Sequence, residues 1–246
     1  MQLLYHIGRY FILLRQVLRR PEKASIYRKQ IFLEINNIGL DSLGIVIIIS
    51  IFMGAVVAIQ TAYNIDSPLV PRYTVGFTTR QSLVLEFSPT IISLILAGKV
   101  GSRIASEIGT MRVTEQIDAL EIMGINPAGY LILPKIVAAM LINPIIITIS
   151  MFVGLFGGWI ACAGGQSVTP DTYVFGIQSY FKAFEVFYAL IKTVVFAFII
   201  TSVAGYQGYY TEGGALEVGK ASTKAVVHAS ILIILFNLIL TQLLLS

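Results

Sequence analysis

Residues 43–62 read LGIVIIISIFMGAVVAIQTA and contain no charged side chain. A helix rises about 1.5 Å per residue, so this run is about 30 Å long, which matches the hydrocarbon core of a bilayer. The stretch predicts a membrane-spanning helix. We therefore expect an all-α integral membrane protein and look for further spans on either side of this one.

The composition of the whole chain agrees with this fold class. Of its 246 residues, 56% are hydrophobic and only 12% are charged, against about 25% charged residues in a typical soluble domain. The mean hydropathy is +0.82. So few polar side chains cannot cover a water-facing surface, which excludes a soluble enzyme and a disordered or fibrous chain. The net charge of +4 is typical of basic residues held at the cytoplasmic face of a membrane, and we expect no nucleic-acid partner.

Four more apolar segments follow the first span. Two of them contain an ionisable residue, Glu86 in the second and Lys192 in the fourth. The third lies in a stretch without charge that is too long for one ordinary span and too short for two. We expect one long tilted helix there, ending in a loop at Gly164-Gly165. The expected spans after the first are 82–98, 134–162, 186–210 and 225–245.

The ends and loops add two shorter helices. Apolar residues recur at helical spacing in the first twenty residues, MQLLYHIGRYFILLRQVLRR, with the arginines mostly off that stripe. This pattern is typical of an amphipathic helix lying in the membrane interface, and Pro21 should end it. The turn-rich loop 64–80 predicts a short helix after Pro71. We treat 1–246 as one membrane domain, with an interfacial region over 1–40 and five spans over 41–246.

The distribution of basic residues predicts the orientation. Thirteen of the 17 lysines and arginines lie in the first 29 residues, beside the 99–135 loop, or at 220–224. Lysine and arginine concentrate in cytoplasmic loops. The N-terminus is therefore expected in the cytoplasm and the C-terminus, after five spans, outside it.

Several catalytic motifs can be set aside. The segment from Gly214 to Lys220 resembles a phosphate-binding loop, but Ala221 stands where the magnesium-binding hydroxyl belongs, and the segment joins two spans. The two histidines are far apart in the chain and lack metal-site spacing. No nucleophile motif of a hydrolase is visible. We expect no catalytic residue, no metal and no cofactor.

The third span contains small residues at i, i+4 spacing, in two neighbouring ridges. Such ridges let helix backbones approach closely. They fit packing within the chain, which we favour, or a dimer interface. The ridges are Gly154, Gly158 and Cys162, and Gly157, Ala161 and Gly165.

Ionisable residues at membrane depth are costly and usually functional. Glu86 could also be a carboxylate near a helix start at the outer interface, and Lys192 could extend to that interface. The two could instead pair with each other. A role in function and these structural roles all remain open on the sequence.

The cytoplasmic loop 99–135 contains one more amphipathic segment. Met111–Gly124 reads MRVTEQIDALEIMG and predicts a short helix of about ten residues. Its apolar stripe and its acidic face would both be satisfied by docking into a groove on a soluble subunit. The residues with this role are Glu115, Ile117, Asp118, Leu120, Glu121 and Met123.

The block that surrounds this helix resembles the signature of MlaE-type permeases, the membrane subunits of ABC transporters that work with MCE-domain proteins. Residues 98–127 read GKVGSRIASEIGTMRVTEQIDALEIMGINP, and LIKTVVFA at 190–197 and KASTKAVVH at 220–228 extend the similarity over nearly the whole chain. The chain departs from the family pattern at Leu85, where members often have arginine, and at Asn237, where some have an acid.

This resemblance implies a homodimeric permease in a bacterial inner membrane, or a plastid counterpart. It also implies a cytoplasmic ABC ATPase, a periplasmic MCE protein and glycerophospholipid as the cargo moved between inner and outer membranes. The loop helix would couple the permease to the ATPase. The candidate residues of the lipid path are Glu86, Lys192, Asn237 and Lys224. A scaffold that only anchors its partners is the alternative; a lipid-modifying enzyme would need a nucleophile or metal cluster, and the sequence contains none.

Overall fold

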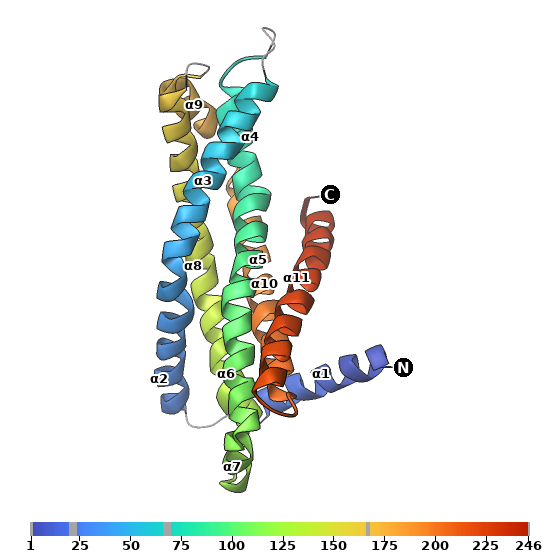
Figure 1. Ribbon diagram of the computed structural model, residues 1–246. Helices are drawn as coiled ribbons and strands as arrows, with labels where there is room; N and C mark the ends of the chain where they lie inside the picture. Colours follow the sequence, from blue (N-terminus) through green and yellow to red (C-terminus); the bar gives the residue numbers. More distant parts are fainter. Residues whose placement is uncertain (1, 20–23, 66–69, 166–167, 246) are drawn as a thin grey trace.

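The computed structural model describes residues 2–19, 24–65, 70–165 and 168–245. Every regular element in these ranges is helical. Five helical rods are long and apolar enough to cross a membrane, and Figure 1 shows them as an elongated bundle. The prediction of an all-helical chain with five spans is confirmed for these residues.

The first two rods are longer than the spans that the sequence predicted. The first includes a π-helical turn, η1, and the second includes two, η2 and η3. In order, the first rod is α2 (Ala24–Ile35), η1 (Asn36–Leu40) and α3 (Asp41–Asn64). The second is α4 (Thr74–Ser82), η2 (Leu83–Ile91), α5 (Ile92–Leu96), η3 (Ala97–Gly101) and α6 (Ser102–Val113). The helix predicted after Pro71 is therefore α4, and it continues into the second span.

The third rod is α8 (Pro127–Gly164), which ends where the loop at Gly164-Gly165 was predicted. It begins seven residues earlier than predicted because Asn126 caps it and Pro127 occupies the first turn, where a missing N–H costs nothing. The remaining helices are α9 (Pro170–Gln178), α10 (Ala183–Tyr209) and α11 (Ala215–Leu245).

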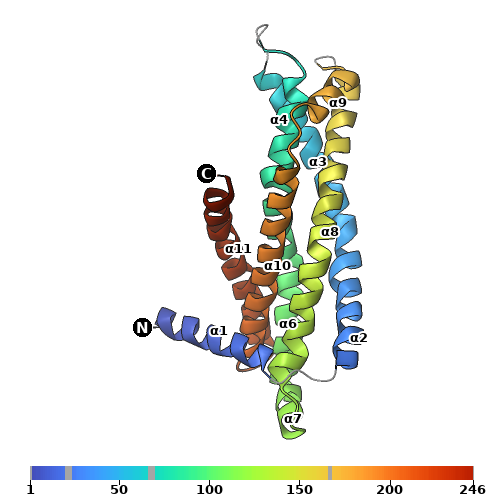
Figure 2. The ribbon, with the colours of Figure 1, turned by 180° about the vertical axis from the view of Figure 1, so that it is seen from behind.

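Two short elements mark opposite ends of the bundle. Helix α7 (Gln116–Ile122) projects beyond one end, and α9 lies at the other end beside α4 (Figure 1). We call these the α7 end and the α9 end. Seen from behind, α11 leans away from the other spans (Figure 2). In its most apolar stretch only 11% of the residues are buried, compared with 61% in that of α10.

Glycines bring α3 and α8 into direct backbone contact. A Cβ atom added to Gly54 would lie 1.8 Å from the Gly154 carbonyl oxygen, and one added to Gly157 would lie 2.1 Å from that of Ile51. A Cβ atom added to Gly158 would instead meet a side chain, the Tyr173 hydroxyl on α9, at 2.1 Å. The small residues of the third span therefore serve packing within the chain, the alternative that we favoured.

Helix α1 (Gln2–Leu18) crosses the α7 end and projects to the side (Figure 1). Leu13 and Val17 are buried against the bundle, whereas Phe11 and Leu18 of the predicted apolar stripe are exposed. Tyr10 donates or accepts a hydrogen bond with Ser202 at 2.8 Å. Burial raises the pKa of the Tyr10 hydroxyl, and this hydrogen bond opposes the rise. One face of α1 thus packs on the protein and leaves its apolar stripe free. Pro21 lies outside the described residues.

Candidate functional site

An ion pair joins the second and fourth spans. Lys192 on α10 donates to Glu86 Oε1 at 2.8 Å and to the Leu85 carbonyl oxygen at 3.2 Å. Lys192 is completely buried, whereas the Glu86 side chain remains 43% exposed. The structure therefore has the direct pairing that the sequence left open, and it excludes a Lys192 side chain that extends to the interface.

Asn237 on α11 and Thr90 complete the cluster. The Asn237 amide donates to Glu86 Oε2 at 3.0 Å. The Thr90 hydroxyl lies between Glu86 Oε2 at 3.2 Å and Asn237 Oδ1 at 3.1 Å. Three of the four candidate path residues thus meet at one place, from three different spans. We call Glu86, Thr90, Lys192 and Asn237 the polar cluster.

A second layer supports the polar cluster. The Lys192 ammonium lies 4.5 Å from the ring centroid of Tyr188, a favourable position for a cation. The Tyr188 hydroxyl contacts Thr241 Oγ1 at 2.7 Å. Sequence reasoning missed Thr90, Tyr188 and Thr241. A usable signal was present, because each lies four residues from a candidate residue and so on the same helix face.

The backbone around Glu86 is adapted to this site. Glu86 and Pro89 lie in η2, and π-helical turns inside α-helices often occur at functional sites. Pro89 lacks a backbone N–H and so removes one donor from this turn. The Leu85 carbonyl oxygen accepts from Lys192. The backbone of η2 therefore contributes an acceptor for the buried ammonium.

The cluster neutralises one charge and keeps the other accessible. An ammonium without a partner at membrane depth would be expensive, and the Glu86 carboxylate compensates it. The exposed part of that carboxylate can still receive a polar or cationic group from outside the protomer. Lys224 does not take part, since it lies thirteen residues from Asn237 on α11, or about 20 Å along the helix. It lines an open groove with Lys220 and His228.

Helix α7 differs from the predicted loop helix. It has seven residues instead of about ten, because Glu115 adopts a left-handed conformation with φ 60° and separates it from α6. Ile117 is buried within the chain, so it is not available to a partner. Asp118 pairs with Arg112 at 2.6 Å, and Glu121 accepts from the Tyr209 hydroxyl at 3.3 Å.

The free surface of α7 is apolar at its tip. Ile122 is 88% exposed and Met123 is 65% exposed; they form the C-terminal end of α7, the helix that projects beyond the bundle (Figure 1). Leu120 is half-buried and Glu115 is exposed. The predicted stripe included Met123 but missed Ile122, because only the fold shows that Ile117 faces inward.

Two other buried cations in the described residues, Arg80 and Lys135, form ion pairs that were not predicted. At the α9 end, Arg80 is 2% exposed and donates to the carbonyl oxygens of Ile177 at 2.6 Å and Ser179 at 2.9 Å. It also lies 3.7 Å from Glu185. Arg80 thus holds the end of α9 against α4. Tyr173 on α9 belongs to a small hydrophobic core at this end, and burial raises the pKa of its hydroxyl.

At the α7 end, Lys135 on α8 pairs with Glu34 on α2 at 2.6 Å and with Glu107 on α6 at 2.9 Å. Lys135 is 3% exposed. This triad joins three rods. Within the described parts of the chain, no group of three His, Cys, Asp or Glu side chains is placed to hold a metal.

Comparison with known proteins identifies the family. The family model described as Permease MlaE matches residues 31–243. A probable ABC transporter permease protein of Rickettsia typhi is 36% identical over 95% of this chain and 88% of its own length. The intermembrane phospholipid transport system permease protein MlaE of Haemophilus influenzae is 28% identical over 85% of this chain and 80% of its own.

A plant protein is also similar. TRIGALACTOSYLDIACYLGLYCEROL 1, a chloroplastic protein of Arabidopsis thaliana, is 29% identical over 94% of this chain and 66% of its own length. Together with the five long apolar helices, these matches indicate a multi-pass inner-membrane permease. The match over nearly the whole chain means that the protein belongs to the MlaE permease family.

Proposed function

We propose that this chain is the permease subunit of an MCE-linked ABC transporter that moves glycerophospholipid between inner and outer membranes. The observation that carries this proposal is the polar cluster: a buried ammonium, its half-exposed carboxylate and an amide, gathered from three spans at membrane depth. The relative from Haemophilus influenzae is named for intermembrane phospholipid transport, which supports lipid as the cargo.

The lipid path follows the exposed side of Glu86 in this proposal. A zwitterionic headgroup offers an ammonium to the carboxylate and a phosphate that the Asn237 amide can bind. Helix α11 brings Asn237 to this side, and its outer surface has little cover within the protomer. A second copy of the chain would enclose the path from that side, which supports a homodimer.

The partners take opposite ends of the bundle. A cytoplasmic ATPase would bind the α7 end through the exposed tip of α7, and the MCE subunit would lie at the α9 end. The N-terminus is then cytoplasmic, and α1 lies in the inner interface with Phe11 and Leu18 toward lipid. This orientation follows from the distribution of basic residues. ATP binding in the partner would shift α7 and reshape the path.

The test compares two variants of the polar cluster, Thr90→Val and Asn237→Leu, with one control. Thr90→Val removes a polar contact of Glu86 without leaving a charge unpaired. Thr78→Val is the matched control, because the Thr78 hydroxyl bonds only to the Thr74 carbonyl oxygen of its own helix. Tagged proteins are purified from native membranes, and bound phospholipid, the copurified ATPase and MCE protein, and lipid transport are quantified.

We expect Thr90→Val and Asn237→Leu to assemble normally and to lose bound phospholipid and transport. The Thr78→Val protein should behave as wild type. If both cluster variants retain phospholipid and transport, the path lies elsewhere. If the wild-type assembly contains its partners but never phospholipid, the chain is a scaffold.

A further inference from the structure

A cleft separates the first and second spans at the α7 end. Helix α3 packs along α8, and at its outer end against α4, but makes few close contacts with α5 or α6. Two small pockets follow this separation. One lies near Ser50 and Phe87, and the other lies nearer α7, between η1 and α6.

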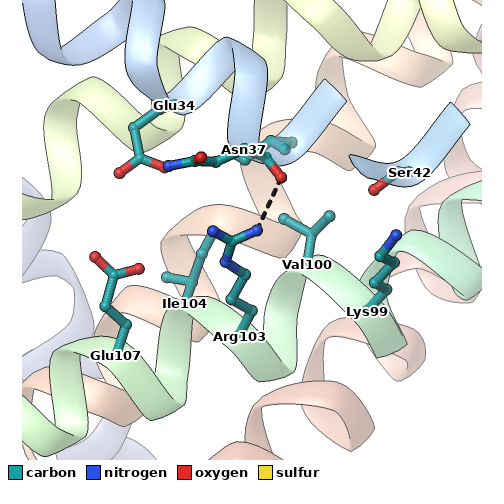
Figure 3. A pocket seen from close by; sticks show the side chains of 9 residues that line it. Glu34, Asn37, Ser42, Lys99, Val100, Arg103, Ile104 and Glu107 are labelled. Carbon is teal, nitrogen blue, oxygen red and sulfur yellow. Dashed lines mark hydrogen bonds between the residues drawn. The ribbon is translucent and has the colours of Figure 1, made fainter. Parts of the chain in front are cut away.

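Side chains bridge the cleft at the pocket nearer α7 (Figure 3). Arg103 on α6 donates to the Asn37 carbonyl oxygen at 3.0 Å and to Asp41 Oδ2 at 3.0 Å. Lys99, one turn earlier, donates to the Asp41 carbonyl oxygen. On the other side of Arg103, Glu107 and Glu34 share the Lys135 ammonium. Polar side chains therefore hold this part of the cleft.

The charged residues that bridge the cleft form a row, and charge is unevenly distributed along it. The row consists of Lys99, Asp41, Arg103, Glu107, Lys135 and Glu34. The half with Lys99 and Arg103 has one carboxylate, Asp41, for two cations. The half with Lys135 has two carboxylates, Glu34 and Glu107, for one cation. The row is neutral overall, but it has one excess positive charge at one end and one excess negative charge at the other. Figure 3 shows the two carboxylates of the second half at one end of the pocket and Lys99 at the other.

The polarity of the row has a direction relative to the membrane. Helix α6 runs toward α7, so Lys99 lies nearer the bilayer centre and Glu107 nearer the water. Arg103 and Glu107 are one turn apart, about 6 Å. In a phosphatidylethanolamine headgroup, the phosphate is joined to the glycerol and the ammonium is on its far side. The excess positive charge of the row therefore lies at the level of the phosphate, and the excess negative charge lies at the level of the ammonium.

We propose that the cleft binds the headgroup of a zwitterionic, amine-bearing phospholipid from the leaflet at the α7 end. The phosphate contacts Lys99 and Arg103, and the ammonium contacts Glu107. This site is distinct from the polar cluster, which lies further along the second span. Binding at this site does not require the proposed lipid transport. Its role, to hold lipid from that leaflet first, rests on the proposed function.

Two further observations fit a lipid. Within the described residues, the Ser42 hydroxyl lines the pocket, is 1% exposed and has no hydrogen-bond partner, so a water in the pocket could join it to a phosphate or ester oxygen at the mouth. The pocket itself has a volume of about 10 Å³, room for about one water. The headgroup therefore lies across its mouth, where Lys99, Arg103 and Glu107 are exposed. Ile45 and Phe52 on the exposed face of α3 offer an apolar surface for the acyl chains.

The test uses photocrosslinking in the full chain. A benzoylphenylalanine at Ile45, 41% exposed, is irradiated in nanodiscs with equal phosphatidylethanolamine and phosphatidylglycerol, without ATP or partners. Mass spectrometry measures the crosslinked lipids. Two variants spare the fold: Lys99→Gln leaves no carboxylate unpaired, because Lys99 contacts a backbone carbonyl, and Glu107→Gln leaves Lys135 paired with Glu34. Lys220→Gln on α11 is the control, an exposed lysine outside the cleft.

We expect the wild-type protein to crosslink phosphatidylethanolamine in preference to phosphatidylglycerol. Lys99→Gln should lower the crosslinking of both lipids about tenfold, because one charge-assisted hydrogen bond to the phosphate is lost. Glu107→Gln should shift the ratio toward phosphatidylglycerol, and Lys220→Gln should change neither. Equal crosslinking in wild type, or an unchanged ratio in Glu107→Gln with only a lower melting temperature, would overturn the site. If the crosslink is selective but an assay of intermembrane lipid transport detects none, the binding site stands and the proposed function is wrong.

Discussion

At the scale of single residues, the two members of the Glu86–Lys192 pair are not equivalent. Lys192 is fully buried, and Glu86 keeps 43% of its side chain exposed. Glu86 also accepts hydrogen bonds from Asn237 and Thr90, so its carboxylate keeps two donors when Lys192 is replaced. Among the described residues, the ammonium has only the Leu85 carbonyl oxygen and the Tyr188 ring besides Glu86.

We predict that Glu86→Gln destabilises the chain more than Lys192→Met does. The first variant leaves a buried ammonium without its counter-charge, which costs about 3–5 kcal/mol. The second removes the buried charge and leaves a half-exposed carboxylate. Detergent-solubilised yield and melting temperature of both variants measure the difference. Equal losses would mean that Glu86 is as enclosed as Lys192 in the assembled protein.

At the scale of secondary-structure elements, α7 shows how a short helix is both anchored and free. Ile117 packs into the bundle, and Asp118 and Glu121 are tied to Arg112 and Tyr209. Reversing the two acidic charges would disturb these contacts inside the chain before it affected a partner. The exposed tip therefore offers the cleaner test of docking.

We predict that Ile122→Ser with Met123→Ser releases the ATPase and leaves the permease folded. Both side chains are exposed, so the free protomer loses little, whereas a partner groove loses its apolar anchors. Copurification of the ATPase and the melting temperature of the permease are measured together. The control, Leu216→Ser, removes a residue of similar size that is 74% exposed on α11. Full ATPase binding by the double variant would place the docking surface elsewhere.

The helical rods were largely predictable as elements, but their extents were not. Apolar length alone locates a span, because hydrocarbon excludes charge. Polar residues then continue the helix beyond that length, as in α6 and α2, where the ion pairs of Lys135 with Glu107 and Glu34 join neighbouring rods. Such contacts join residues far apart in sequence, so periodicity could not reveal them.

At the scale of the whole molecule, the two ends of the bundle differ in chemistry. The α7 end contains most basic residues. The α9 end has a small hydrophobic core of its own, and Arg80 holds α9 there through hydrogen bonds to its C-terminal carbonyl oxygens. This asymmetry is the basis of the proposed orientation.

We predict that a cysteine at Val70 labels from the periplasmic side and that one at Met123 labels only after the cytoplasmic face is opened. Val70 is 38% exposed and Met123 is 65% exposed, so access depends on sidedness. The background is Cys162→Ala, which removes the chain's one native thiol. A membrane-impermeant maleimide gives the readout, and the reverse pattern would invert the topology.

The sequence by itself determined the fold class, the five spans and the family resemblance. These properties depend on hydrophobic length, local spacing and contiguous motifs, which are visible along one dimension. Only the tertiary structure decided that Glu86, Lys192 and Asn237 meet while Lys224 stays about 20 Å away along its helix, that Ile117 turns inward, and that charged residues bridge the cleft between α3 and α6. The physical reason is that a buried charge is stable only beside a partner, and helix packing decides which residue becomes that partner.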